Sequence, residues 1–95
     1  MPVSVHHPRY QALQAAMTAC RKKAGLSQAL LAQQLEVGQS YVSKIERGEA
    51  YVDVLLFVDW CQACGVRPGV ALDRVLATLP SPTGRPVKPK IESFW

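Results

Sequence analysis

Apolar residues recur along this chain at the three- and four-residue spacing of helices, and no stretch alternates apolar and polar residues as strands do. The pattern predicts an all-α protein with five helices, at about residues 9–24, 28–35, 39–47, 54–64 and 68–79. One apolar stripe of each helix is expected to face the core. The predicted stripes are Leu13, Ala16, Met17 and Cys20; Leu31, Ala32 and Leu35; Val42 and Ile45; Val54, Phe57, Val58, Cys61 and Cys64; and Leu72, Val75, Leu76 and Leu79.

Local signals mark where the helices begin and end. Ser27 and Asp53 can cap the second and fourth helices, because their side-chain oxygens accept from free N–H groups of the first turn. Gly25 is suited to end the first helix in the left-handed conformation. We therefore divide the chain into an N-terminal arm (residues 1–8), a helical domain (residues 9–79) and a tail (residues 80–95). The tail holds four of the seven prolines, and we expect it to be flexible unless it docks on a partner.

Length and charge narrow the classes of function. Ninety-five residues correspond to one domain, and the formal net charge is +4. Basic residues gather in residues 1–24 and in the tail, while acidic residues gather between them. A polyanionic partner would account for this distribution, and a solvated surface would do so equally well. No apolar run is long enough to span a membrane and no secretory signal is visible, so we expect a cytoplasmic protein.

The three cysteines raise the question of a metal or redox site. Cys61 and Cys64 form a C-x-x-C pair, but the pair lies within a helical pattern and no second pair accompanies it. An odd cysteine count without a secretory signal also argues against a disulfide framework. We interpret the cysteines as small apolar core residues, and expect no metal and no cofactor.

The third predicted helix has an unusual polar face. Val42 and Ile45 account for its inner side, which leaves Gln, Ser, Lys and Arg side chains pointing outward. Serine lowers helix propensity, so two serines on a short exposed helix indicate that a binding partner must approach this face closely. Gln can bond adenine, Lys can bond guanine, and Ser can bond a base or a phosphate, while a helix fits the major groove of DNA. The outward face is Gln39, Ser40, Ser43, Lys44 and Arg47.

At these residues the chain resembles the Cro/C1-type (Xre-like) helix-turn-helix family. The resemblance rests on GLSQ at residues 25–28, LA at 31–32 and QSYVSKIERG at 39–48, and it spans roughly residues 9–66. It implies a five-helix, lambda-repressor-like DNA-binding domain, with the helix-turn-helix at its second and third helices. It also implies a homodimer that binds double-stranded DNA at an operator with two half-sites.

The resemblance assigns roles to individual residues. Gln39, Ser40 and Lys44 would face base edges. Glu46 would hold the fold together by pairing with a basic group of the first helix. For Tyr41, covering the edge of the core is an equally open role. The residues expected near phosphates are Gln28, Tyr41, Ser43 and Arg47.

Two residues of the turn depart from the family pattern. Glu36 stands where glycine is usual, so it either adopts a strained left-handed conformation or the turn is shaped differently. Gly38 replaces the usual Ser or Thr cap of the third helix and caps it less well.

Several leucines fall where polar residues are expected, among them Leu30 and Leu55. Such a patch can mark an interface, and local packing under the tail is an equally open explanation. Our candidates for dimer contacts are Leu56, Leu72, Val75, Leu76 and Leu79.

These observations favour a bacterial or phage transcriptional regulator, most simply a repressor that occludes its operator. Two alternatives remain open: an antitoxin that regulates its own operon and binds a toxin through its tail, and a protein-interaction module with the same fold. An enzyme is disfavoured, because the sequence has no HExxH, nucleophile elbow, phosphate loop or plausible carboxylate pair.

Overall fold

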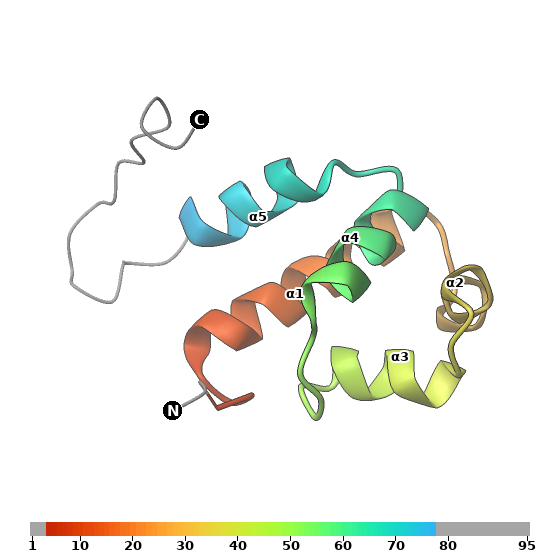
Figure 1. Ribbon diagram of the computed structural model, residues 1–95, viewed down its shortest axis with the longest axis horizontal. Coiled ribbons are helices and arrows are strands. Elements are labelled where there is room, and N and C mark those ends of the chain that lie inside the picture. Colours follow the sequence, from red (N-terminus) through yellow and green to blue (C-terminus); the bar gives the residue numbers. More distant parts are fainter. Residues whose placement is uncertain (1–3, 78–95) are drawn as a thin grey trace.

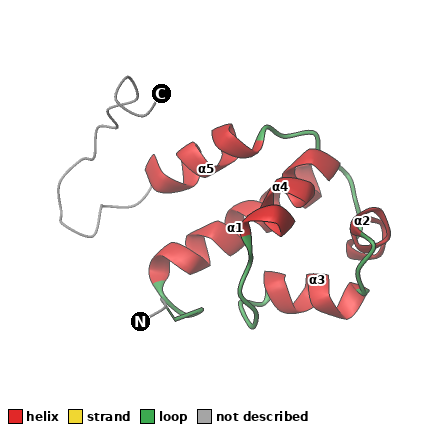
Figure 2. Ribbon diagram, viewed as in Figure 1, coloured by secondary structure: helices red, strands yellow, loops and turns green. Residues whose placement is uncertain are grey.

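Five helices and their connecting loops form the part of the chain that the computed structural model describes, residues 4–77 (Figure 1, Figure 2). No strand occurs within residues 4–77, so the prediction of an all-α fold with five helices is confirmed. The predicted tail and Leu79 lie outside the described residues. The helices are α1 (Pro8–Lys23), α2 (Gln28–Leu35), α3 (Gln39–Glu46), α4 (Val54–Ala63) and α5 (Pro68–Ala77).

The caps show why the helices begin where they do. The Ser27 hydroxyl accepts from the backbone N–H of Leu30 at 3.0 Å, and the Asp53 carboxylate accepts from that of Leu56 at 2.8 Å. Both predicted caps are therefore confirmed. The α1 helix begins one residue earlier than predicted, because Nδ1 of His7 caps it by accepting from the backbone N–H of Arg9 at 3.1 Å.

The helices pack around α1 and α4, and α5 and α3 lie on opposite edges of the molecule (Figure 1). The α1 helix contacts α3, α4 and α5, while α2 contacts α3 and α4. This arrangement leaves α3 supported from one side only, by α1 and α2.

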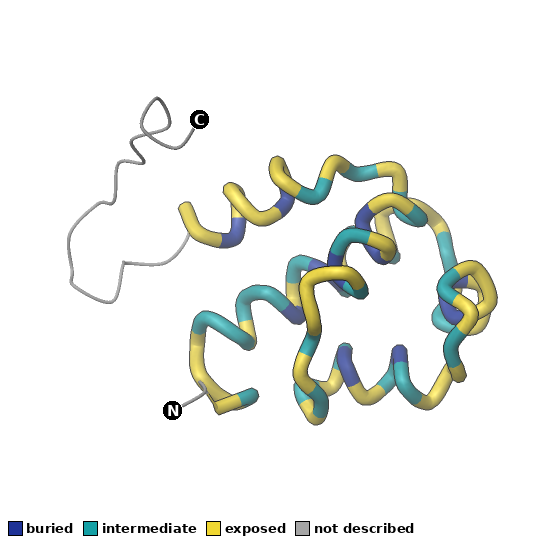
Figure 3. The backbone as a smooth tube through the Cα atoms, in the orientation of Figure 1, coloured by how far each residue is buried: buried dark blue, intermediate teal, exposed yellow. Residues whose placement is uncertain are grey.

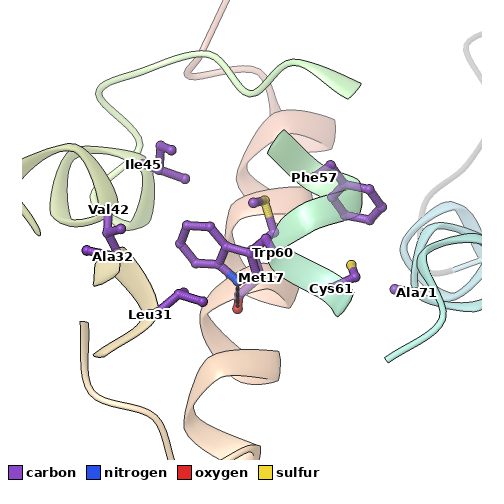
Figure 4. Close-up of a cluster of buried hydrophobic side chains, with 9 residues drawn as sticks. All are labelled: Met17, Leu31, Ala32, Val42, Ile45, Phe57, Trp60, Cys61 and Ala71. Atoms are coloured by element: carbon purple, nitrogen blue, oxygen red, sulfur yellow. Dashed lines mark hydrogen bonds between the residues drawn. The ribbon is translucent and has the colours of Figure 1, made fainter. Parts of the chain in front are cut away.

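Trp60 of α4 lies at the centre of the core (Figure 4). Its side chain is fully buried, and its indole N–H donates to the backbone carbonyl of Met17 at 2.9 Å. This bond ties α4 to α1 and satisfies a polar group that would otherwise be costly to bury. The other buried members of the core are Met17, Leu31, Ala32, Val42, Ile45, Phe57, Cys61 and Ala71.

Two predicted apolar stripes were partly wrong. Val54 is 76% exposed. It is the first residue of α4, and the buried residues of that helix, Phe57, Trp60 and Cys61, begin one turn later. On α5 the buried residues are Ala71 and Val75, four residues apart, whereas Leu72 and Leu76 are exposed. The small side chain of Ala71 packs against the core, so the larger leucines remain outside.

Gly48 meets a buried polar residue of α1. Gln14 is only 4% exposed, and a Cβ atom on Gly48 would lie 2.8 Å from Oε1 of Gln14. Gly48 also has a φ of 76°, so both the close approach and the left-handed backbone favour glycine. The Nε2 atom of Gln14 is buried and has no hydrogen-bond partner among the described residues.

The turn between α2 and α3 contains Glu36, for which the sequence left two backbone conformations open. Glu36 has φ 58° and ψ 41°, which is the left-handed helical conformation that normally favours glycine. The backbone N–H of Val37 donates to the carbonyl of Ala32 at 3.0 Å and holds the turn in this shape. Gly38 then begins α3 without any side-chain cap. Of the two alternatives for Glu36, the structure shows the left-handed one.

Replacing Glu36 by glycine should therefore stabilise the protein. We expect Glu36→Gly to raise the free energy of unfolding by about 1 kcal/mol, because the steric strain at φ 58° disappears. Urea denaturation would measure the change. Glu36→Ala is the matched control, since it removes the same carboxylate but keeps a Cβ atom; equal stability of the two variants would contradict the strain argument.

Candidate nucleic-acid interface

The α3 helix has one buried side and one exposed polar side. Val42 and Ile45 are fully buried, and Figure 3 shows α3 at an edge of the molecule with its buried positions toward the other helices. On the outer side Gln39, Ser40 and Lys44 are exposed. The three residues predicted to contact bases thus share one accessible helical face, and contact with bases stays a prediction.

A buried ion pair fixes α3 against α1. Nε of Arg21 lies 2.6 Å from Oε2 of Glu46, and its Nη2 lies 3.1 Å from Oε1. Both side chains are largely buried, with 11% and 7% of their surface exposed. The hydrogen bond that Arg21 donates to Glu46 is the main cause that raises the pKa of Arg21, so the guanidinium stays charged despite its burial. The expected pairing of Glu46 with a basic residue of the first helix is confirmed.

Further hydrogen bonds extend this ion pair to α2. Nε2 of Gln28 donates to Oε1 of Glu46 at 2.9 Å, and Nη1 of Arg21 donates to the carbonyl of Leu26 at 2.8 Å. Glu46 therefore joins the start of α2 to the end of α3. Gln28 still has a second amide N–H, so its predicted contact with a phosphate is compatible with this bond.

A second, exposed ion pair lies just beyond α3. Arg47 donates from Nε to Glu49 at 2.8 Å and from Nη2 at 3.3 Å, and its Nη1 donates to the hydroxyl of Ser43. This hydrogen bonding raises the pKa of Arg47 and lowers that of Glu49. Two of the predicted phosphate contacts, Ser43 and Arg47, are thus neighbours in the structure, and their contact with phosphate stays a prediction.

Tyr41 is half-buried and packs against the core. This position fits its alternative role of covering the edge of the core. Its contact with a phosphate stays a prediction.

The loop between α3 and α4 is held by a residue that sequence reasoning missed. The hydroxyl of Tyr10 accepts from the backbone N–H of Val52 at 3.1 Å and donates to the Val52 carbonyl at 3.3 Å. The rings of Tyr10 and Tyr51 meet edge to face, with centroids 5.3 Å apart. No local pattern signals contacts between residues this far apart in the sequence.

Cys61 belongs to the buried core and Cys64 packs against it, whereas Cys20 is half-buried outside that cluster. Cys61 is fully buried, and desolvation is the main cause that raises its pKa to about 11. Desolvation also raises the pKa of Cys64. Both thiols therefore remain protonated near neutral pH, which fits their interpretation as small core residues. Within residues 4–77, no three His, Cys, Asp or Glu side chains are grouped so that they could hold a metal ion.

The candidate dimer contacts differ in their accessibility. Leu72 and Leu76 are 42% and 46% exposed, whereas Val75 is buried within the domain and Leu56 packs partly against the core. Leu79 lies outside the described residues. Leu72 and Leu76 are thus the candidates that a second copy could reach most readily.

Comparisons with known proteins place this geometry in a family. A helix-turn-helix family model (HTH_3) matches residues 17–70, which include α2, α3 and α4. The comparison with curated proteins gives no match. None of the described helices is long and apolar enough to cross a membrane.

Solved structures resemble the whole described domain. An XRE-family like protein from Pseudomonas syringae pv. tomato str. DC3000 is 39% identical with a TM-score of 0.73, covering 80% of this chain and 93% of that one. Two structures of the clp gene regulator ClgR from Corynebacterium glutamicum are 27% and 28% identical, with TM-scores of 0.67 and 0.65. They cover 81% and 80% of this chain, and 77% and 91% of their own.

Loss of the Glu46 carboxylate should destabilise the protein strongly. We expect Glu46→Ala to lower the free energy of unfolding by about 3 kcal/mol, because it leaves the buried guanidinium of Arg21 without its partner. Thermal or urea denaturation would measure the loss. Glu49→Ala is the control, since it removes a carboxylate from an exposed arginine pair; similar losses in the two variants would contradict a special role for the buried pair.

Proposed function

Because the chain belongs to the Cro/C1-type (Xre-like) helix-turn-helix family, we propose that it is a DNA-binding transcriptional regulator that binds an operator through α3. The observation that carries this proposal is the polar outer face of α3. The helix is held in place by the Glu46 network, the hydrogen bonds that Arg21 and Gln28 donate to the largely buried carboxylate of Glu46. The relative named as a regulator of the clp gene supports a role in transcription.

In this proposal α3 enters the major groove. Gln39, Ser40 and Lys44 contact base edges and set the sequence preference. Phosphate contacts supply most of the affinity and make it fall as salt rises. The residues that contact phosphates are Gln28, Tyr41, Ser43 and Arg47.

We further propose that two copies bind a palindromic operator and repress by occluding it. A single α3 reads only a few base pairs, so a second copy doubles the site and places two half-sites about one helical turn apart. The exposed leucines of α5 give the second copy an apolar surface to contact. Action in the cytoplasm, where such an operator is found, belongs to the same proposal.

Truncation of the base-contacting side chains should weaken specific binding. We expect Lys44→Ala and Gln39→Ala each to cost about 1–3 kcal/mol of binding free energy on a duplex selected from a random pool. Circular dichroism should show unchanged helicity, since both residues are exposed. Gln62→Ala, an exposed position on α4, is the matched control; if the α3 variants bind as tightly as the control, α3 does not contact the bases.

A charge on α5 should weaken self-association. We expect Leu76→Glu to shift the protein toward monomer in sedimentation equilibrium, because burying an unpaired carboxylate at an apolar contact is costly. Gln62→Glu adds the same charge on α4 and should leave the equilibrium unchanged. If the wild type dimerises and Leu76→Glu does so equally well, the dimer contact lies elsewhere.

A further inference from the structure

The end of α3 fixes the position of one acidic residue beside the DNA-facing surface. The backbone N–H of Glu49 donates to the carbonyl of Lys44 at 2.8 Å, and that of Gly48 donates to the carbonyl of Ile45 at 3.0 Å. With Gly48 in the left-handed conformation, these two bonds close the helix end as a Schellman motif. Glu49 therefore starts from a well-defined backbone position at the edge of the proposed interface.

The Glu49 carboxylate occupies a place that suits an anion. Arg47 donates to it from Nε and Nη2, at 2.8 and 3.3 Å, and Lys44 attracts it as well. Ser43 accepts from the same guanidinium. Arg47 and Ser43 are two of the groups expected to contact phosphates, and Lys44 is expected to contact a base. An acidic side chain thus lies among the groups that the proposed function assigns to DNA.

The ion pair between Arg47 and Glu49 is expected to add little to the stability of the fold. Both side chains are 52% exposed, and exposed ion pairs contribute little to the free energy of folding. Two parallel N–H donors of a guanidinium bind a carboxylate and a phosphate in the same way. The pair in the free protein therefore resembles the contact that Arg47 would make with DNA.

We propose that Glu49 competes with DNA phosphate for Arg47 and so lowers the affinity of this surface for DNA. The inference rests on the proposed function. Before Arg47 can bind a phosphate through the same edge, its pair with Glu49 must open, and the cost of opening that pair is subtracted from the free energy of binding. Because phosphate contacts carry no sequence information, Glu49 sets the strength of binding and leaves the sequence preference unchanged.

The test compares Glu49→Gln with the wild type on a labelled random-sequence duplex of about 20 base pairs, over a range of salt concentrations. We expect the variant to bind about threefold to tenfold more tightly near physiological salt, with a log–log salt slope steeper by about 1. Asp59→Asn removes the same charge from an exposed position on α4 and should change the affinity less than about twofold. In an Arg47→Met background the gain from Glu49→Gln should shrink to that of the control.

The outcomes separate this inference from the proposed function. If the wild type binds DNA and Lys44→Ala weakens that binding, α3 is the interface; equal or weaker binding by Glu49→Gln then overturns the competition alone. A gain that persists in the Arg47→Met background also overturns it, because the effect would not act through Arg47. If the wild type does not bind DNA at any salt concentration, both the proposed function and the inference fall.

Discussion

The buried hydrogen-bonded ion pair between Arg21 and Glu46 is the interaction on which the placement of α3 depends. Glu46 is the last residue of α3, and its carboxylate is bound at once by α1, through Arg21, and by α2, through Gln28. Apolar contacts from Val42 and Ile45 hold α3 against the core, but they are not directional. The charged hydrogen bonds add direction, because a guanidinium and a carboxylate bind in a fixed planar geometry. They set the angle at which α3 presents its outer face.

The same arrangement explains how a strained turn and a weakly capped helix are tolerated. Glu36 adopts a left-handed conformation and Gly38 gives α3 no side-chain cap, so the turn alone does not stabilise the start of α3. Support comes from the other end, where the Glu46 network and the glycine closure at Gly48 hold the helix.

Much of the fold follows from the local sequence. Ser27 and Asp53 act through bonds to residues three positions away, so a reader of the sequence can find such caps. The polar face of α3 is also readable, since it needs only helical spacing and side-chain chemistry. Trp60 and Tyr10 were missed because their bonds, to Met17 and Val52, join distant parts of the chain. On α5 the leucines misled the prediction, because Ala71 and Val75, one helical turn apart, form the inner face, and the neighbouring Leu72 and Leu76 are exposed. The pairing of Glu46 was found only through the family resemblance.

Methylation interference can show whether α3 reads DNA from the major groove. A duplex selected by the protein from a random pool would be methylated sparsely, at guanine N7 in the major groove and adenine N3 in the minor groove. If α3 lies in the major groove, methylated guanines within two half-sites, about one helical turn apart, prevent binding. Interference confined to adenine N3 would contradict it, because the protein would then be reading the minor groove.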